Sequence, residues 1–146
     1  MSDSLPESLG SARAACEELF LDFHRYIDAG QATRGLALFS DQPVPRLEVR
    51  GQTYAGKAAL EGFLQAREGD TARQTRHLAS NFRFVLVSDS RARGTGNLTL
   101  FRRGGPEGSA LVLEAVVDCE LEFVRTGEGE WRVSSRRHSR FATAPD

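Results

Sequence analysis

The stretch 111–125 constrains the fold of this chain more than any other part of the sequence. Every second residue in it is apolar, in the order Leu111, Leu113, Ala115, Val117, Cys119, Leu121 and Phe123. The acidic residues fall on the opposite parity, at Glu114, Asp118, Glu120 and Glu122. A period of two is typical of an antiparallel strand with one face on a core and the other facing water or a polar partner. We therefore expect a sheet whose acidic face points outward.

Strand character continues on both sides of this stretch, with turn-forming residues between the segments. The expected strands are 75–87, 91–103 and 131–141. The first half of the chain instead shows helical spacing over 11–29, with shorter helices at 31–39 and 56–64 around a short strand pair at 46–50 and 53–54. Helices and strands that are segregated along a chain indicate the α+β class.

The segment 75–84 contains a conflict of parity. His77 and Ala79 share one side of the strand, whereas Phe82 and Phe84 share the other. One buried face cannot hold both pairs unless the strand contains an extra residue, so we predict a β-bulge near Ser80-Asn81. A bulge also bends a sheet. We expect a strongly curved antiparallel sheet with three helices from the first half of the chain closing its concave side, which makes a cone with a pocket that His77 faces.

Composition excludes several classes of function. The formal net charge of −1 gives no field strong enough to hold nucleic acid or an anionic membrane surface. Cys16 and Cys119 both fall on apolar faces, which favours two buried thiols over a disulfide. No pair of histidines or cysteines has the spacing of a metal site, so we expect neither a metal nor another cofactor.

The length and the termini indicate one soluble domain. We expect a flexible tail over 1–10 and a single domain over 11–142. The polar, acidic start is unlike a secretory signal, and no apolar run approaches a membrane span. These features predict a cytoplasmic protein without a membrane partner.

The order of short motifs resembles the SnoaL-like branch of the nuclear-transport-factor-2-like superfamily. The matching pieces are YIDAG at 26–30, LFSD at 38–41, GKAAL at 56–60, TRHLASN at 75–81 and EWRV at 130–133. Such a fold hosts many chemistries, so the activity has to be argued from the site.

The resemblance implies a catalytic dyad. In scytalone dehydratase and hexachlorocyclohexane dehydrochlorinase members, an Asp at the end of the first helix orients a strand His that removes a substrate proton, and these positions match Asp28 and His77. Imidazole is well suited to accept a proton near neutral pH, and a carboxylate on its other nitrogen fixes the tautomer. Leu47, Phe23 and Cys119 stand where ketosteroid isomerase relatives carry a base, a Tyr and a second acid, which argues against an isomerase of that type.

The remaining expectations concern the walls of the cone. The side chains expected to contact a small hydrophobic, cyclic substrate are Phe20, Phe23, Tyr26, Tyr54, Leu64, Phe84, Leu113 and Cys119. His24 and His138 are expected on the surface. The basic residues of the last strand, among them Arg136, are expected to pair with the acidic face of 111–125. This outer sheet face is also the surface expected to form a homodimer.

Two functions stay open from the sequence. One is a cofactor-independent lyase, dehydratase or isomerase in which His77 is the general base and Asp28 its orienting partner. The alternative is a non-catalytic ligand-binding or assembly protein in which the same two residues only satisfy each other. A water-filled cavity beside His77 favours the enzyme, and side chains that fill this space favour the alternative.

Overall fold

The computed structural model describes residues 8–104 and 110–145. Within them the chain forms helix α1 (Leu9–Asp28), the 3-10 helix η1 (Ala32–Leu38) and helix α2 (Lys57–Gly69). The strands are β1 (Arg46–Val49), β2 (Gln52–Ala55), β3 (Thr75–Ser88), β4 (Arg91–Gly104), β5 (Ala110–Arg125) and β6 (Trp131–Thr143). The predicted order of elements is confirmed, although the second helix is a 3-10 helix.

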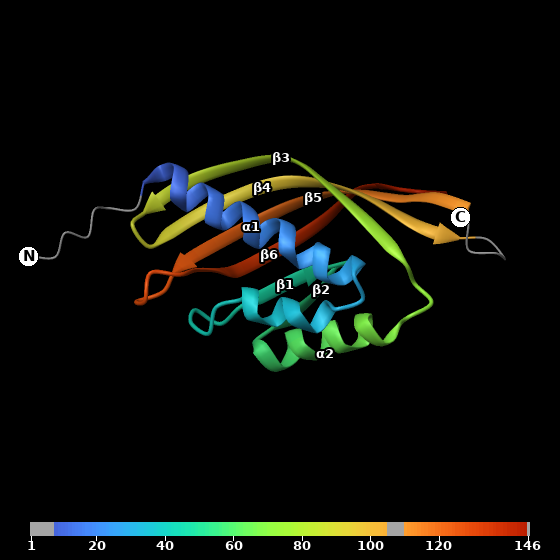
Figure 1. The fold of residues 1–146 in the computed structure, drawn as a ribbon, viewed down its shortest axis with the longest axis horizontal. Helices are drawn as coiled ribbons and strands as arrows, with labels where there is room; N and C mark the ends of the chain where they lie inside the picture. The colour runs from blue at the N-terminus through green and yellow to red at the C-terminus, as the bar shows by residue number, and fades with distance from the viewer. Residues whose placement is uncertain (1–7, 105–109, 146) are drawn as a thin grey trace, which may run out of the picture.

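The strands of the described residues form one curved sheet in the order β2-β1-β6-β5-β4-β3. All neighbouring strands are antiparallel except β1 and β6, which are parallel. Figure 1 shows α1 lying across one face of the four long strands, with η1 and α2 gathered beside the short β1–β2 pair. The predicted α+β cone is therefore confirmed.

Helix α1 begins slightly earlier than the sequence predicts. The Ser8 hydroxyl accepts a hydrogen bond from the backbone N–H of Ser11, so Ser8 caps the helix and Ser11 lies inside it. Gly30, at φ 75°, follows the end of the helix in the left-handed region that stops helices. Leu9 and Gly10, which the sequence places in the tail, belong to α1, and residues 1–7 lie outside the described part of the chain.

The predicted bulge in β3 is confirmed. Ser80 pairs with Asn97 and Arg83 pairs with Thr95, so β3 has one residue more than β4 in this interval. Asn81 takes up the extra residue with φ 57°, a conformation that Asn tolerates better than most residues. Because of this bulge, Phe82 packs on the same side of the sheet as His77, where both face α1.

Four further one-residue register shifts were not predicted from the sequence, and two of them lie near strand ends, at Val87 of β3 and Phe141 of β6. In β5, Ala115 pairs with Leu100 and Leu113 with Phe101, which leaves Glu114 as the extra residue. In β6, Ser135 pairs with Glu122 and Val133 with Phe123, so Ser134 is extra. Each bulge reverses which parity of its strand faces α1.

The core lies between α1 and the sheet, and the two surfaces approach very closely. A Cβ placed on Gly96 of β4 would lie 2.6 Å from the Phe20 ring of α1, and one on Gly94 would lie 2.9 Å from the Phe123 ring. The absence of side chains at these two positions lets the aromatic rings sit directly on the backbone of the sheet. Cys16 and Cys119 are buried in this core and form no disulfide, as predicted.

Over residues 8–104 and 110–145, no helix is both long enough and apolar enough to cross a bilayer.

Candidate functional site

Asp28 and His77 are in direct contact. The Nδ1 atom of His77 lies 2.7 Å from Oδ1 of Asp28, and the backbone N–H of His77 donates to Oδ2 at 2.7 Å. An ionised carboxylate can only accept, so Nδ1 carries a proton, and in the neutral form of the ring Nε2 carries the lone pair. The last residue of α1 and the third residue of β3 thus fix the tautomer and the orientation of one imidazole.

A second layer of hydrogen bonds holds the carboxylate. The Thr75 hydroxyl donates to Oδ1 of Asp28 at 2.7 Å and accepts a bond from Arg67 of α2 at 3.2 Å. Burial alone would raise the pKa of Asp28, but the hydrogen bonds and charge of His77 and the Thr75 bond together lower it from 3.8. Asp28 is therefore an ionised acceptor at neutral pH.

His24 is buried beside the dyad, so its expected surface position is wrong. The spacing of α1 puts His24 on the same face as Phe20, Phe23 and Ile27. Its ring stacks on His77 with centroids 5.4 Å apart, and its Nε2 atom has no hydrogen-bond partner. Burial, followed by the charge of Arg136, holds the pKa of His24 well below its usual value, so the ring is neutral.

Arg136 is the largest departure from the sequence-based expectation. It was expected to pair with acidic residues on the outer face, but the bulge at Ser134 turns it inward and leaves it 1% exposed. The guanidinium carbon lies 5.3 Å from the Phe20 ring centroid and 4.3 Å from that of Phe23. Such cation–π contacts offset part of the cost of burying a charge.

The donors of Arg136 are only partly used. Nε donates to His138 at 2.8 Å and Nη1 donates to the Phe20 carbonyl at 3.2 Å, whereas Nη2 is buried without a partner. Desolvation lowers the pKa of Arg136 to about 10, which still leaves it protonated at neutral pH. His138, also expected on the surface, accepts from this cation, and burial holds its pKa well below the usual value.

Several predicted lining residues lie around this buried group. The guanidinium of Arg136 lies over the rings of Phe20 and Phe23, and the buried Cys119 thiol interacts electrostatically with it. Leu64 is fully buried in the core, and Phe84 packs on Phe123 with ring centroids 6.5 Å apart.

Three of the predicted residues lie elsewhere. Leu113 is 49% exposed, because the bulge at Glu114 moves it off the core face. Tyr26 packs under the guanidinium of Arg34. The Tyr54 hydroxyl donates to Gln52 of its own strand. In this conformation the substrate contacts predicted for Leu113, Tyr26 and Tyr54 have no structural counterpart beside His77.

The described hollows do not reach the dyad. The largest, about 1090 Å³, lies on the outer face of the sheet and is lined by Glu48, Arg93 and Glu120 among others. The others, of about 490 and 220 Å³, adjoin the β3 bulge and the end of the sheet near Thr75. Neither His77 nor Asp28 lines any of the three. The ring of His24 stacks on one face of the His77 ring.

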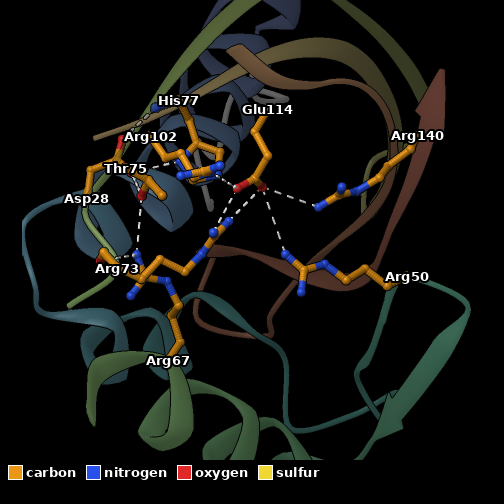
Figure 2. Close-up of polar contacts among 9 residues, drawn as sticks. All are labelled: Asp28, Arg50, Arg67, Arg73, Thr75, His77, Arg102, Glu114 and Arg140. Atoms are coloured by element: carbon orange, nitrogen blue, oxygen red, sulfur yellow. Dashed lines mark hydrogen bonds and ion pairs between the residues drawn. The ribbon is translucent and has the colours of Figure 1, made fainter. Parts of the chain in front are cut away.

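A second polar cluster lies at the end of the cone, as Figure 2 shows. Glu114 was expected on the outer face, but the bulge directs it toward Arg73, which donates both terminal nitrogens at 2.7 Å. Arg50, Arg102 and Arg140 approach the same carboxylate. Over residues 8–104 and 110–145, no group of three or more His, Cys, Asp or Glu side chains is placed to hold a metal ion.

Residues 10–137 match the model of the SnoaL-like domain. No curated protein matches the sequence. Among solved structures, the hexachlorocyclohexane dehydrochlorinase LinA-type3 from Novosphingobium barchaimii superposes with a TM-score of 0.77 at 22% identity, over 93% of this chain and 90% of the other.

Two proteins from Novosphingobium aromaticivorans are also similar. An NTF2-like protein with a cystatin-like fold has a TM-score of 0.76 at 18% identity, over 94% of this chain and 93% of its own. A candidate scytalone dehydratase has a TM-score of 0.73 at 19% identity, over 91% and 86%. At these identities the structural likeness establishes the fold alone.

Proposed function

Because the chain belongs to the SnoaL-like domain family, we propose that it is a cofactor-independent lyase, dehydratase or isomerase acting on a small organic substrate. The observation that carries this proposal is the 2.7 Å contact between His77 Nδ1 and Asp28 Oδ1, which leaves Nε2 of a partly buried imidazole as a proton acceptor. The dehydrochlorinase and the candidate scytalone dehydratase among the similar structures support the reaction class.

The reaction begins with proton abstraction. Nε2 of His77 takes a proton from a carbon of the substrate, and the resulting imidazolium is stabilised by the ionised Asp28. In an elimination, the C–H electron pair forms a carbon–carbon double bond while the leaving group departs from the neighbouring carbon with its own bonding pair. In an isomerisation, the same proton returns to a different carbon.

Arg136 supports this chemistry. Its buried guanidinium has an unused N–H donor and lies in the same aromatic box as His24, which stacks on His77. A fixed positive charge in a water-poor site strongly stabilises negative charge that develops on a substrate oxygen or a leaving group. Arg136 is therefore the electrophilic partner in this mechanism.

The test is turnover by variants of the dyad on a panel of cyclic β-hydroxy ketones and chlorinated cycloalkanes. His77→Ala is expected to lower kcat by about 10²- to 10⁴-fold, the usual contribution of a general base. Asp28→Asn should also lower it, whereas Asp118→Asn, an exposed carboxylate on the outer face, should not. Turnover that persists unchanged in His77→Ala would remove the general-base role.

A non-catalytic function is favoured by a different observation. The described hollows do not include His77, and the ring of His24 covers one face of its imidazole. A ligand-binding or assembly protein needs no free imidazole. Native mass spectrometry of the purified protein distinguishes the two functions, since this alternative requires any co-purified ligand to leave chemically unchanged. The same spectrum tests the predicted homodimer through the outer sheet face.

A further inference from the structure

Four arginines converge on one carboxylate at the open end of the cone, and we call this group the arginine mouth (Arg50, Arg73, Arg102, Arg140 and Glu114; Figure 2). They come from four segments: the β1–β2 turn, the loop before β3, β4 and β6. Arg73 binds Glu114 at 2.7 Å, Arg102 at 3.3 Å, Arg140 at 3.5 Å and Arg50 at 4.0 Å. Four positive charges against one negative charge leave three positive charges in excess.

The excess charge is visible in the electrostatics of the cluster. Burial lowers the pKa of Arg50, and the charges of Arg140 and Arg73 lower it further, against the opposing effect of Glu114. Arg73 uses both terminal nitrogens on Glu114, whereas Arg50 reaches the carboxylate only at the limit of an ion pair. The carboxylate therefore binds Arg73 closely and Arg50 only weakly.

A stabilising ion pair with Glu114 does not explain why an arginine stands at position 50. Its side chain is 59% exposed, and an exposed ion pair contributes at most about 1 kcal/mol. Arg50 also has φ 54° in the two-residue turn Arg50-Gly51, where Asn is preferred and a long side chain is disfavoured. A costly backbone position that holds a guanidinium over the mouth indicates a role for the guanidinium itself.

The mouth lies within reach of the dyad. His77 pairs with Leu100 on β4, which pairs with Ala115 on β5, the neighbour of Glu114. Two strand spacings place Glu114 about 10 Å from His77 along the sheet. Arg67 connects the regions, because it donates to the carbonyl of Arg73 and to Thr75, which binds Asp28. A molecule of this length spans the distance between the two sites.

We propose that the arginine mouth binds an oxyanion group, a carboxylate or a phosphate, on the small molecule that this protein accepts. Guanidinium groups pair with both kinds of oxyanion through parallel N–H donors, and an anion here would balance the excess charge. Anion binding at the mouth stands by itself, and its assignment to the substrate of His77 rests on the proposed function. The substrate class is then an amphipathic acid rather than a purely hydrophobic compound.

Calorimetric titration at low salt tests the proposal with two probes, inorganic phosphate and succinate. Saturable 1:1 binding of at least one probe is expected, weakened tenfold or more in both Arg50→Gln and Arg140→Gln. Arg50→Lys should retain more of the affinity than Arg50→Gln. The matched control is Arg93→Gln, an exposed arginine on the outer sheet face, which should bind as the unaltered protein does. Preference for phosphate indicates a phosphate ester, and preference for succinate a carboxylic acid.

Two results overturn the proposal: the lack of saturable binding of either probe, or equal affinity in the Arg50→Gln and Arg93→Gln proteins. The titration is repeated on His77→Ala, which should bind the probe normally because the mouth does not use the imidazole. If His77→Ala binds the probe normally and its turnover is undiminished, the general-base role of His77 is ruled out and the anion site remains. If neither the unaltered protein nor His77→Ala binds a probe but His77→Ala loses turnover, the anion site is ruled out and the general-base role remains.

Discussion

Two regions of the molecule hold arginine in opposite ways. Arg136 is buried among aromatic rings, and it donates hydrogen bonds to His138 and to a backbone carbonyl. The arginine mouth is half open to water and gathers four guanidinium groups around Glu114, whose side chain is 15% exposed. Both regions therefore have more positive charge than their carboxylates balance.

The two regions differ in the free-energy cost of holding unbalanced positive charge. A cation without a carboxylate in the interior loses hydration that rings and carbonyls only partly replace, whereas excess charge near water is screened within about 10 Å at ordinary salt. Arg136 should therefore lower the free energy of unfolding, whereas the arginine mouth should barely affect it. A site kept at such a cost is expected at a functional centre.

Of the variants that compare these two regions, Arg136→Met is expected to have the largest effect on activity, because it removes the buried charge. Activity is expected to fall about 10²-fold or more, as when a donor to developing charge is removed. The free energy of unfolding should stay equal or rise by about 1 kcal/mol, because apolar replacements of buried charges are often stabilising. Urea unfolding and turnover measured on one preparation check both. A loss of stability above about 2 kcal/mol would make Arg136 a structural residue.

Gly96→Ala adds a methyl group against the aromatic rings that surround Arg136. The new Cβ would meet the Phe20 ring at 2.6 Å, and overpacking of this kind costs about 1–3 kcal/mol. Thermal unfolding measures the loss. Gly127→Ala, in an open turn with no atom within 4 Å of the new carbon, is the matched control and should change stability by less than about 0.5 kcal/mol. An equally small loss of stability in both variants would mean that α1 shifts to make room for the new methyl group.

Glu114→Gln tests the mouth. The hydrogen bonds of Arg73 lower the pKa of Glu114 from 4.5, more than burial raises it. The folded pKa is the lower one, so this contribution to stability is complete above pH 4.5 and is lost as the pH falls through the folded value. The variant should lose about 1 kcal/mol at neutral pH and low salt, and less at high salt.

Acid titration of stability provides the control for this variant. Glu114→Gln should lose the part of the acid sensitivity that Glu114 supplies, and added phosphate should restore stability by occupying the place of the carboxylate. An unchanged acid profile would show that Glu114 and its arginines are not coupled in solution.

Arg137→Gln is the smallest effect and sharpens the contrast with its neighbour Arg136. Arg137 is 56% exposed and pairs with Glu48 at 3.4 Å and Glu120 at 3.9 Å. Exposed pairs of this kind contribute about 0.5 kcal/mol or less. Chemical unfolding should therefore detect little change, and activity should be unaffected. A larger loss would indicate that the outer face carries a function of its own.

The sequence predicts the fold well because its periodicities are strong. The bulge in β3 was predictable, since His77 and Phe82 cannot share a face without one, and the contact between Asp28 and His77 follows from the family resemblance. His24 lies on the same helical face as Phe20 and Phe23, so helical spacing was a signal that could have placed it in the interior.

Arg136 and Glu114 could not be placed in this way. The end of β6 is almost entirely polar, so no apolar parity marks the bulge at Ser134 that turns Arg136 inward. The alternation of β5 is unbroken across Glu114, and it predicts the wrong face for Leu113. A bulge leaves a trace in a sequence only where the apolar residues before it and after it stand on opposite parities.

The bulges at Asn81, Glu114 and Ser134 have a consequence for how this chain can diverge. Each adds a single amino acid that decides whether the following side chains enter the cone, so a one-codon deletion at Asn81 or Ser134 would exchange interior for exterior over the rest of the strand. Substitution at these positions leaves the count intact. Relatives are therefore expected to tolerate changes of identity there far more readily than changes of length.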